Sequence, residues 1–176
     1  MAKPQLKIVR KLVTGGDPEQ LYPMPGPEDF AKAGSEYLEA EDLEKIGEAL
    51  IEKQGGFGYL KELKIVYLWK EKGGESHGKA VLGRCQRPKG LLAKFCDADF
   101  IVWLAADHHR TFRSTRFQVE ATTFHELCHT DYDEEKDKAR LVGHDYEGFC
   151  REVELYGAWR SDLEKAAQSF HQLSLL

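Results

Sequence analysis

The stretch Thr122–Glu134, TTFHELCHTDYDE, contains the pattern His-Glu-x-x-His at His125, Glu126 and His129. Two histidines four residues apart lie on the same face of a helix, so both ring nitrogens can reach one metal ion. The intervening glutamate lies about 100° further round the helix, where it can take a proton from a metal-bound water. Chance alone would supply the pattern in roughly 3% of chains of this composition, so the surrounding sequence must decide whether it is a metal site.

An apolar stripe next to the motif predicts how its helix packs. Four residues follow one another at the spacings of a single helical face: Phe117, Ala121, Phe124 and Cys128. We expect this stripe to face the core, with the two histidines on its flank and the glutamate further round. That arrangement would place a metal at the edge of a cleft. The alternative is a half-buried helix whose histidines make ordinary hydrogen bonds.

A catalytic zinc ion takes three protein ligands and keeps one position open for water. His144 follows His129 by 15 residues and stands at the start of a predicted closing helix. The positive end of the helix dipole disfavours imidazolium there, and neutral imidazole is the form that binds metal. Glu147 and Glu152 are the alternative third ligands. We favour His144, so the predicted metal ligands are His125, His129 and His144.

The rest of the chain predicts a Pro- and Gly-rich arm over residues 1–27 and a single domain over residues 28–176. Helices are expected at about 31–37, 43–54 and 90–96, one or two helices at 108–130, and a long closing helix at 145–170. Strands are expected at 62–70, 78–86 and 98–107, the second as the antiparallel partner of the first. This order predicts an α+β domain, in which a small, mostly antiparallel sheet of about three strands packs with helices.

The composition indicates a globular protein with a sizeable core. Of its 176 residues, 41% are hydrophobic and 31% are charged, and the formal net charge is -5. The mild acidity argues against a surface built throughout to hold nucleic acid, although it allows a local basic patch. No apolar run approaches the roughly 20 residues that span a bilayer, and the N-terminus lacks the features of a secretory signal. We therefore expect a cytoplasmic protein with no membrane partner.

The four cysteines form no Cys-x-x-Cys pair, which argues against a zinc ribbon or a thioredoxin-type site. We interpret them as reduced thiols, most of them small core residues, and disulfides are the alternative.

The motifs FHELCHT and GHDYEGFCREVELYGAW resemble those of the phage metallopeptidases, which are small zincin-like domains encoded by bacteriophages and prophages. Members carry a His-Glu-Leu-x-His helix, a His-Asp-x-x-x-Phe element and a Tyr-Gly-x-Trp element. The matching residues here are His125 to His129, His144 and Asp145 with Phe149, and Tyr156 and Gly157 with Trp159. The resemblance covers roughly residues 28–160. It implies a minimal zincin-like fold, a peptidase activity and a location in the host cytoplasm.

The layout is also similar to that of the SprT/Spartan proteases, in which a third histidine follows in a Gly-His-x-x-x-Phe-like context. This similarity supports His144 as a ligand. It also supplies the alternative function, a DNA-associated protease or nucleic-acid-binding module. A second alternative is a non-catalytic protein that keeps the zinc fold for interaction.

Two groups of cationic or titratable residues precede the motif. Arg110, Arg113 and Arg116 recur at spacings of three and could meet phosphates, although a solvated helix face explains them better. His108 and His109 are adjacent and share no helical face, so we expect them to be surface residues.

The predicted function is hydrolysis of peptide bonds with one zinc ion per chain. Zinc lowers the pKa of its bound water towards neutrality, and Glu126 takes the proton and returns it to the leaving amine. Tyr156 is the predicted donor to the oxyanion, and Tyr132 is the alternative. Three aspartates could orient the ligand histidines: Asp131, Asp133 and Asp145.

The expected partner is a protein or peptide substrate that adds as a strand to a sheet edge. Residues 98–106 are the candidate edge because they lead towards the motif helix. Their apolarity predicts a central, buried strand equally well. Nucleic acid is not favoured as a partner.

Overall fold

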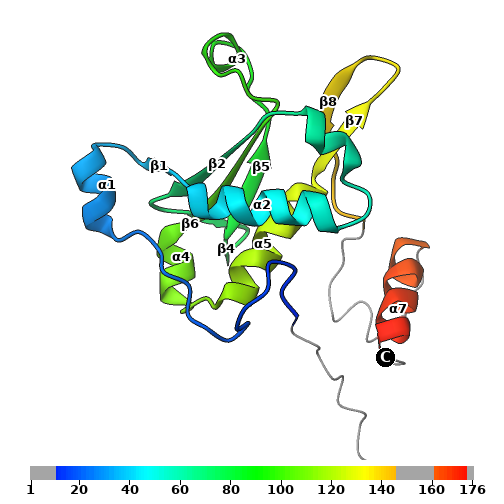
Figure 1. Cartoon of the computed structure of the whole chain (residues 1–176), viewed down its shortest axis with the longest axis horizontal. Helices are drawn as coiled ribbons and strands as arrows, with labels where there is room; N and C mark the ends of the chain where they lie inside the picture. The colour runs from blue at the N-terminus through cyan, green and yellow to red at the C-terminus, as the bar shows by residue number, and fades with distance from the viewer. Residues whose placement is uncertain (1–10, 146–160, 174–176) are drawn as a thin grey trace, which may run out of the picture. The chain divides into compact units, whose positions relative to one another are not determined.

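In the computed structural model, the described residues are 11–145 and 161–173 (Figure 1). The helices are α1 (Pro27–Ala33), α2 (Glu41–Lys53), η1 (Gly58–Glu62), α3 (Leu92–Phe95), α4 (Ala106–Thr111), α5 (Arg116–Cys128) and α7 (Ser161–Leu173). The strands are β1 (Tyr37–Glu39), β2 (Ile65–Lys70), β3 (Glu75–Ser76), β4 (Lys79–Ala80), β5 (Gly83–Gln86), β6 (Phe100–Ala105), β7 (Thr130–Asp133) and β8 (Lys138–Leu141). The predicted α+β class is confirmed. The described residues up to Val142 form one compact unit.

The main sheet has the strand order β1-β2-β6-β5. β2 and β6 run parallel, with Ile65 opposite Phe100, and the two outer pairs run antiparallel. The predicted pairing of 62–70 with 78–86 is wrong, because β6 lies between these strands. The candidate edge at 98–106 is also wrong, since every residue of β6 is buried. A strand that is covered on both faces has a continuous apolar sequence. The alternative prediction for 98–106, a central buried strand, is therefore correct.

The core lies between this sheet and the two longest helices of the unit, α2 and α5 (Figure 1). α2 contributes Leu43, Ile46 and Leu50 at helical spacing, and the sheet contributes Tyr67, Trp69, Cys85, Val102 and Leu104. The cysteines of the described residues are free thiols; Cys85 is buried, Cys96 is half-buried and Cys128 is exposed. The core therefore positions α5, which carries the His-Glu-x-x-His motif, directly against β5 and β6.

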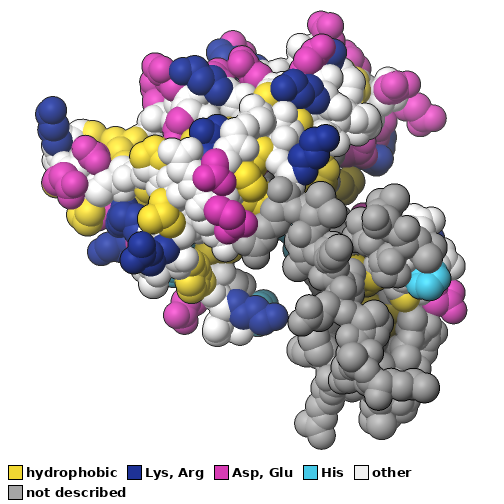
Figure 2. Space-filling view, turned by 60° about the horizontal axis from the view of Figure 1, so that its bottom comes forward, with side chains coloured by type: hydrophobic (Ala, Val, Ile, Leu, Met, Phe, Trp, Pro, Cys, Tyr) yellow, Lys and Arg dark blue, Asp and Glu magenta, His cyan; other side chains and the backbone are white. Residues whose placement is uncertain are grey.

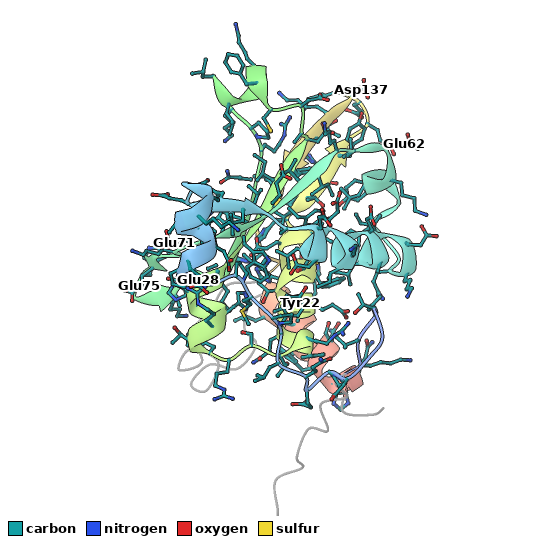
Figure 3. All side chains as sticks on the ribbon, turned by 60° about the vertical axis from the view of Figure 1, so that its left-hand side comes forward. Tyr22, Glu28, Glu62, Glu71, Glu75 and Asp137 are labelled. Carbon is teal, nitrogen blue, oxygen red and sulfur yellow. The ribbon has the colours of Figure 1, made fainter. Side chains whose placement is uncertain are left out.

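The segment before α1 runs without helix along the start of α5. Tyr22 N–H donates to the Ser114 carbonyl at 3.0 Å, and Arg116 N–H donates to the Gln20 carbonyl at 2.8 Å. The Tyr22 hydroxyl, which lies beside α2 in Figure 3, donates to Asp42 at 2.9 Å. These hydrogen bonds attach the Pro- and Gly-rich segment to the domain. Within the described residues, no helix combines the length and the apolar character needed to cross a membrane.

Candidate metal centre

The motif helix α5 packs through a different face from the one that the sequence predicted. Its buried residues are Val119, Glu120, Thr123, Glu126 and Leu127. In the predicted stripe Ala121, Phe124 and Cys128 are exposed and Phe117 is half-buried. The prediction is wrong because the polar groups on the buried face have partners. The Thr123 hydroxyl, for example, donates to the Val119 carbonyl at 2.9 Å, which removes the cost of burying it.

The first two histidines of the motif lie on consecutive turns at the end of α5. Their ring centroids are 5.1 Å apart and the rings are nearly perpendicular, at 82°. His129 is the C-cap residue, so the chain leaves the helix there and enters β7 directly. His125 is exposed and His129 is half-buried. The pair therefore sits at the surface end of an anchored helix, where an ion can be reached from solvent.

The ring of His129 is oriented by the main chain of Val142. Its Nδ1 lies 2.9 Å from the Val142 carbonyl oxygen. A carbonyl can only accept, so Nδ1 carries a proton, and in the neutral ring the lone pair is then on Nε2. The Val142 N–H in turn donates to the His129 carbonyl at 2.9 Å. This reciprocal pair fixes the tautomer that a metal needs, in the way that outer partners orient ligating histidines.

The hairpin β7–β8 brings the third histidine back to the motif. Its register places Thr130 opposite Leu141, so the chain returns to its starting point within one hairpin. His144 follows Val142 by two residues, and two residues of chain span at most about 7 Å. One ring nitrogen from each of His125, His129 and His144 lies within 4.8 Å of the others. The structure therefore brings together the three histidines that the sequence singled out.

The donor set fits zinc. Three neutral imidazoles with an open fourth position are a known catalytic arrangement for this ion. Ligand nitrogens about 2.0–2.1 Å from a tetrahedral ion lie about 3.4 Å from one another. The observed separation of up to 4.8 Å is therefore about 1.4 Å longer than a bound ion requires, and His125 and His144 are the two exposed rings of the set.

Glu126 is buried between α5 and the edge strand β5. Glu126 is 5% exposed, and the Cys85 N–H lies beside its carboxylate. Burial raises the pKa of the Glu126 carboxyl above its ordinary value, and the neighbouring His129 ring and the Cys85 N–H partly offset this. The sequence had placed this glutamate on the side away from the core. In the structure, the Glu126 carboxylate instead faces the main chain of β5.

Gly83 allows the close approach of β5 to this carboxylate. A Cβ atom on Gly83 would lie 3.0 Å from Glu126 Oε1, 3.2 Å from its Cγ and 3.1 Å from the Trp103 carbonyl oxygen. These distances are shorter than ordinary contacts. Any larger residue would push on the carboxylate or on the main chain of β6. This role cannot be recognised from the sequence, because nothing along the chain links a strand glycine to a helix 43 residues further on.

Tyr59 supports the turn that follows the metal helix. Its hydroxyl donates to the Thr130 carbonyl at 2.7 Å and lies 3.0 Å from the Thr130 hydroxyl. Thr130 is the residue after His129, so this contact from η1 anchors the helix end. No motif points to Tyr59, and the sequence analysis did not find it.

The other predicted site residues lie elsewhere or outside the described residues. The Tyr132 hydroxyl donates to Asp137, which lies at the far end of the β7–β8 hairpin (Figure 3). Asp131 and Asp133 pair with the cation Arg140 on the neighbouring strand. The following predicted residues lie outside the described residues: Tyr156, Glu147, Glu152, Phe149, Gly157 and Trp159.

Two of the three arginines before the motif make contacts within the fold. Arg110 donates to the Pro25 carbonyl, and the guanidinium of Arg116 lies against Gly16, so both contact the segment before α1. His109 is fully buried, which contradicts its predicted surface position. On the face shown in Figure 2, Lys and Arg side chains lie in separate groups among Asp and Glu side chains. That face carries no continuous basic surface of the kind that holds nucleic acid.

Comparison with known proteins identifies one family. A family model described as "Putative phage metallopeptidase" matches residues 35–170, which include the motif helix, the hairpin and His144. No curated protein and no solved structure matches the chain.

Proposed function

Because the chain belongs to the phage metallopeptidase family, we propose that it is a zinc-dependent peptidase with Glu126 as its general base. The main support for this proposal is the histidine cluster, in which one ring nitrogen from each of three histidines lies within 4.8 Å of the others. The buried Glu126 follows His125 directly on α5. His125, His129 and His144 would hold one zinc ion.

The residues of the chain divide the chemistry among them. Zinc bound to the three histidines would supply a water of lowered pKa and an electrophilic contact for the scissile carbonyl. Glu126 would accept the proton of the attacking water on its carboxylate and return it to the leaving nitrogen. Gly83 and the Cys85 N–H of β5 lie beside this carboxylate, which restricts where it can receive the proton. The raised pKa of Glu126 makes the carboxylate a stronger base than an exposed glutamate.

β5 is an edge strand of the main sheet beside the site, and a peptide could pair with its main chain. Ala105 N–H donates to the Leu82 carbonyl at 2.8 Å, and bonded positions alternate along an antiparallel pair. The main-chain groups of Gly83 and Cys85 therefore point away from β6. Among the described residues, no strand covers this side of β5. The Cys85 N–H faces Glu126, so the main-chain groups of Gly83 are the ones left for a substrate. We propose that an extended protein or peptide substrate lies along β5, which replaces the buried strand β6 as the candidate edge.

Two substitutions test the proposal together. We expect Glu126→Gln to retain one equivalent of zinc and to lose hydrolysis of an unfolded protein substrate such as casein. We expect His144→Ala to lose zinc affinity by about 10- to 100-fold or more, measured by competition with a chromogenic chelator. His108→Ala is the matched control because His108 lies outside the cluster, and it should retain both properties.

Two results would reject the proposal. Hydrolysis by purified Glu126→Gln at the parent rate would remove Glu126 as the base. Unchanged zinc affinity in His144→Ala would remove His144 from the ligand set.

A further inference from the structure

The connection between β5 and β6 carries the most exposed large apolar side chains of the described residues. Phe95 is 81% exposed and Leu91 is 74% exposed, and Leu92 beside them is 47% exposed. All three lie in or next to α3, the short helix that projects beyond the end of the sheet in Figure 1. Single exposed apolar residues are normal on a protein surface, but three within five residues on a projecting tip form a patch. We name residues 89–95 the α3 tip.

The α3 tip is basic within an acidic chain. Residues 76–96 contain five Lys and Arg residues and no Asp or Glu, whereas the whole chain has a formal net charge of -5. Lys89 and Lys94 flank the apolar residues and are exposed. Neither lysine forms an ion pair with another described residue. The tip therefore combines exposed apolar side chains with flanking positive charges. A partner that complements it has an anionic surface over an apolar interior.

The side-chain chemistry of the α3 tip favours a lipid surface over other anionic partners. Leu91 and Leu92 are aliphatic and cannot stack on nucleotide bases, and Phe95 is the single aromatic residue of the tip. Apart from Lys94, residues 91–95 carry no side chain that could form directed hydrogen bonds with a protein groove. A bilayer interface requires neither stacking nor directed bonds. It accepts apolar side chains to a shallow depth while lysines extend to the phosphates.

We propose that the α3 tip inserts into the interface of an anionic lipid bilayer and holds the protein on the membrane surface. Leu91, Leu92 and Phe95 enter the acyl boundary, and Lys89 and Lys94 contact the lipid phosphates. The sequence had predicted no membrane partner because no segment spans a bilayer, but shallow insertion needs no such segment. This inference is independent of the proposed peptidase function.

Vesicle co-sedimentation of the full chain tests the proposal. We expect binding to vesicles that contain phosphatidylglycerol and much weaker binding to phosphatidylcholine alone. Leu91→Ser with Phe95→Ser should weaken binding to the anionic vesicles by about tenfold or more. Lys89→Glu with Lys94→Glu should remove the preference for anionic lipid. Phe112→Ser is the matched control, since Phe112 is an exposed aromatic residue at 55% but caps the end of α4, away from the α3 tip.

A second measurement reports insertion in case a double variant fails to fold. Phe95→Trp should show tryptophan fluorescence that brominated lipid quenches beyond the parent level. His144→Ala should bind vesicles like the parent, which separates this inference from the proposed metal site.

Three outcomes would overturn the inference. The first is a parent protein that binds neither kind of vesicle. The second is vesicle binding that depends on the lysines and not on the apolar residues, because it indicates adsorption without insertion. The third is tip-dependent binding to a DNA oligonucleotide that outcompetes the vesicles, because it assigns the tip to nucleic acid.

Discussion

Thr14 and Glu120, 106 residues apart, are joined by two hydrogen bonds to one carboxylate oxygen. The Thr14 N–H donates to Glu120 Oε2 at 3.0 Å, and the Thr14 hydroxyl donates to the same atom at 2.6 Å. The Val13 N–H donates to the other oxygen at 2.7 Å. Glu120 is 5% exposed and precedes His125 by five residues on α5. The start of the described chain is therefore tied to the metal helix through a buried carboxylate that these donors satisfy.

Removal of this carboxylate should destabilise the domain. We expect Glu120→Ala to lower the free energy of unfolding by about 2–4 kcal/mol, because it leaves the buried donors of Val13 and Thr14 without an acceptor. Urea denaturation followed by circular dichroism measures the change. Thr14→Val should cost about 1 kcal/mol for the lost hydroxyl donor, and Thr14→Ser is the control that keeps it. Equal stability of Glu120→Ala and the parent would show that the contact is not formed in solution.

The sequence predicted the elements of this fold better than their packing. The apolar run at 98–107 predicts the strand β6 correctly. The position of β6 in the sheet, between β2 and β5, is not predicted by this run. Sequence spacing cannot show that β5 pairs with β6 rather than with β2, because both pairings keep the same alternation of side chains. The buried face of α5 was missed for a related reason. Its polar members, Glu120 and Glu126, have partners from the arm and from β5 that are remote in sequence.

The three histidines that the structure brings together were predictable because their spacing in the sequence is local. His125 and His129 follow from the helical repeat alone, and His144 follows from a connecting segment long enough to reverse the chain direction. The structure forms that segment as the hairpin β7–β8. The parts that orient these groups are main-chain atoms, namely the Val142 carbonyl and the Cys85 N–H. Every residue carries such atoms, so no residue type signals their role.

Gly83 should matter more for catalysis than for metal binding. We expect Gly83→Ala to displace the Glu126 carboxylate by a few tenths of an ångström and to lower kcat by about tenfold or more, since misplacement of a catalytic group is costly. Zinc content should remain that of the parent. Gly58→Ala is the control, because a Cβ there meets nothing within 4 Å. Parent-level kcat in Gly83→Ala would show that the strand moves instead of the carboxylate.

Replacement of Gly47 by alanine should destabilise the domain, although the same replacement usually stabilises a helix. Replacing a glycine inside an exposed helix by alanine adds about 1 kcal/mol of stability. A Cβ on Gly47, however, would overlap the ring and hydroxyl of Tyr67, and overpacking costs about 1–3 kcal/mol. We expect Gly47→Ala to lower the free energy of unfolding, measured in urea, whereas Glu48→Ala on the exposed side should leave it nearly unchanged.

Tyr67→Phe provides a direct check on this reason. The Tyr67 hydroxyl is buried without a hydrogen-bond partner among the described residues, so its removal should cost little. It also removes one of the atoms that a new Cβ would meet. The double variant Gly47→Ala with Tyr67→Phe should therefore be less destabilised than the sum of the two single changes. Strict additivity would indicate that the loss in Gly47→Ala has another cause.

His109 should make the stability of the domain depend on pH in a defined window. Its ring is fully buried, with Nδ1 at 2.9 Å from the Ser114 hydroxyl, and it packs edge-to-face with Trp69. Burial lowers the pKa of His109 to about 4, against an ordinary value of 6.5. The effect of His108 adds to this shift, and the Leu82 carbonyl and Asp107 oppose it.

Between these two pH values the unfolded chain binds a proton at His109 that the folded chain does not. The free energy of unfolding should therefore fall as the pH drops from about 6.5 towards 4, by up to ~3 kcal/mol. We expect His109→Gln to be less stable at pH 7 but to lose less stability over that range, in urea titrations at a series of pH values with a chelator present. Subtraction of the variant from the parent cancels the metal-site histidines, which both proteins share. Equal slopes in the two proteins would assign the acid sensitivity to groups other than His109.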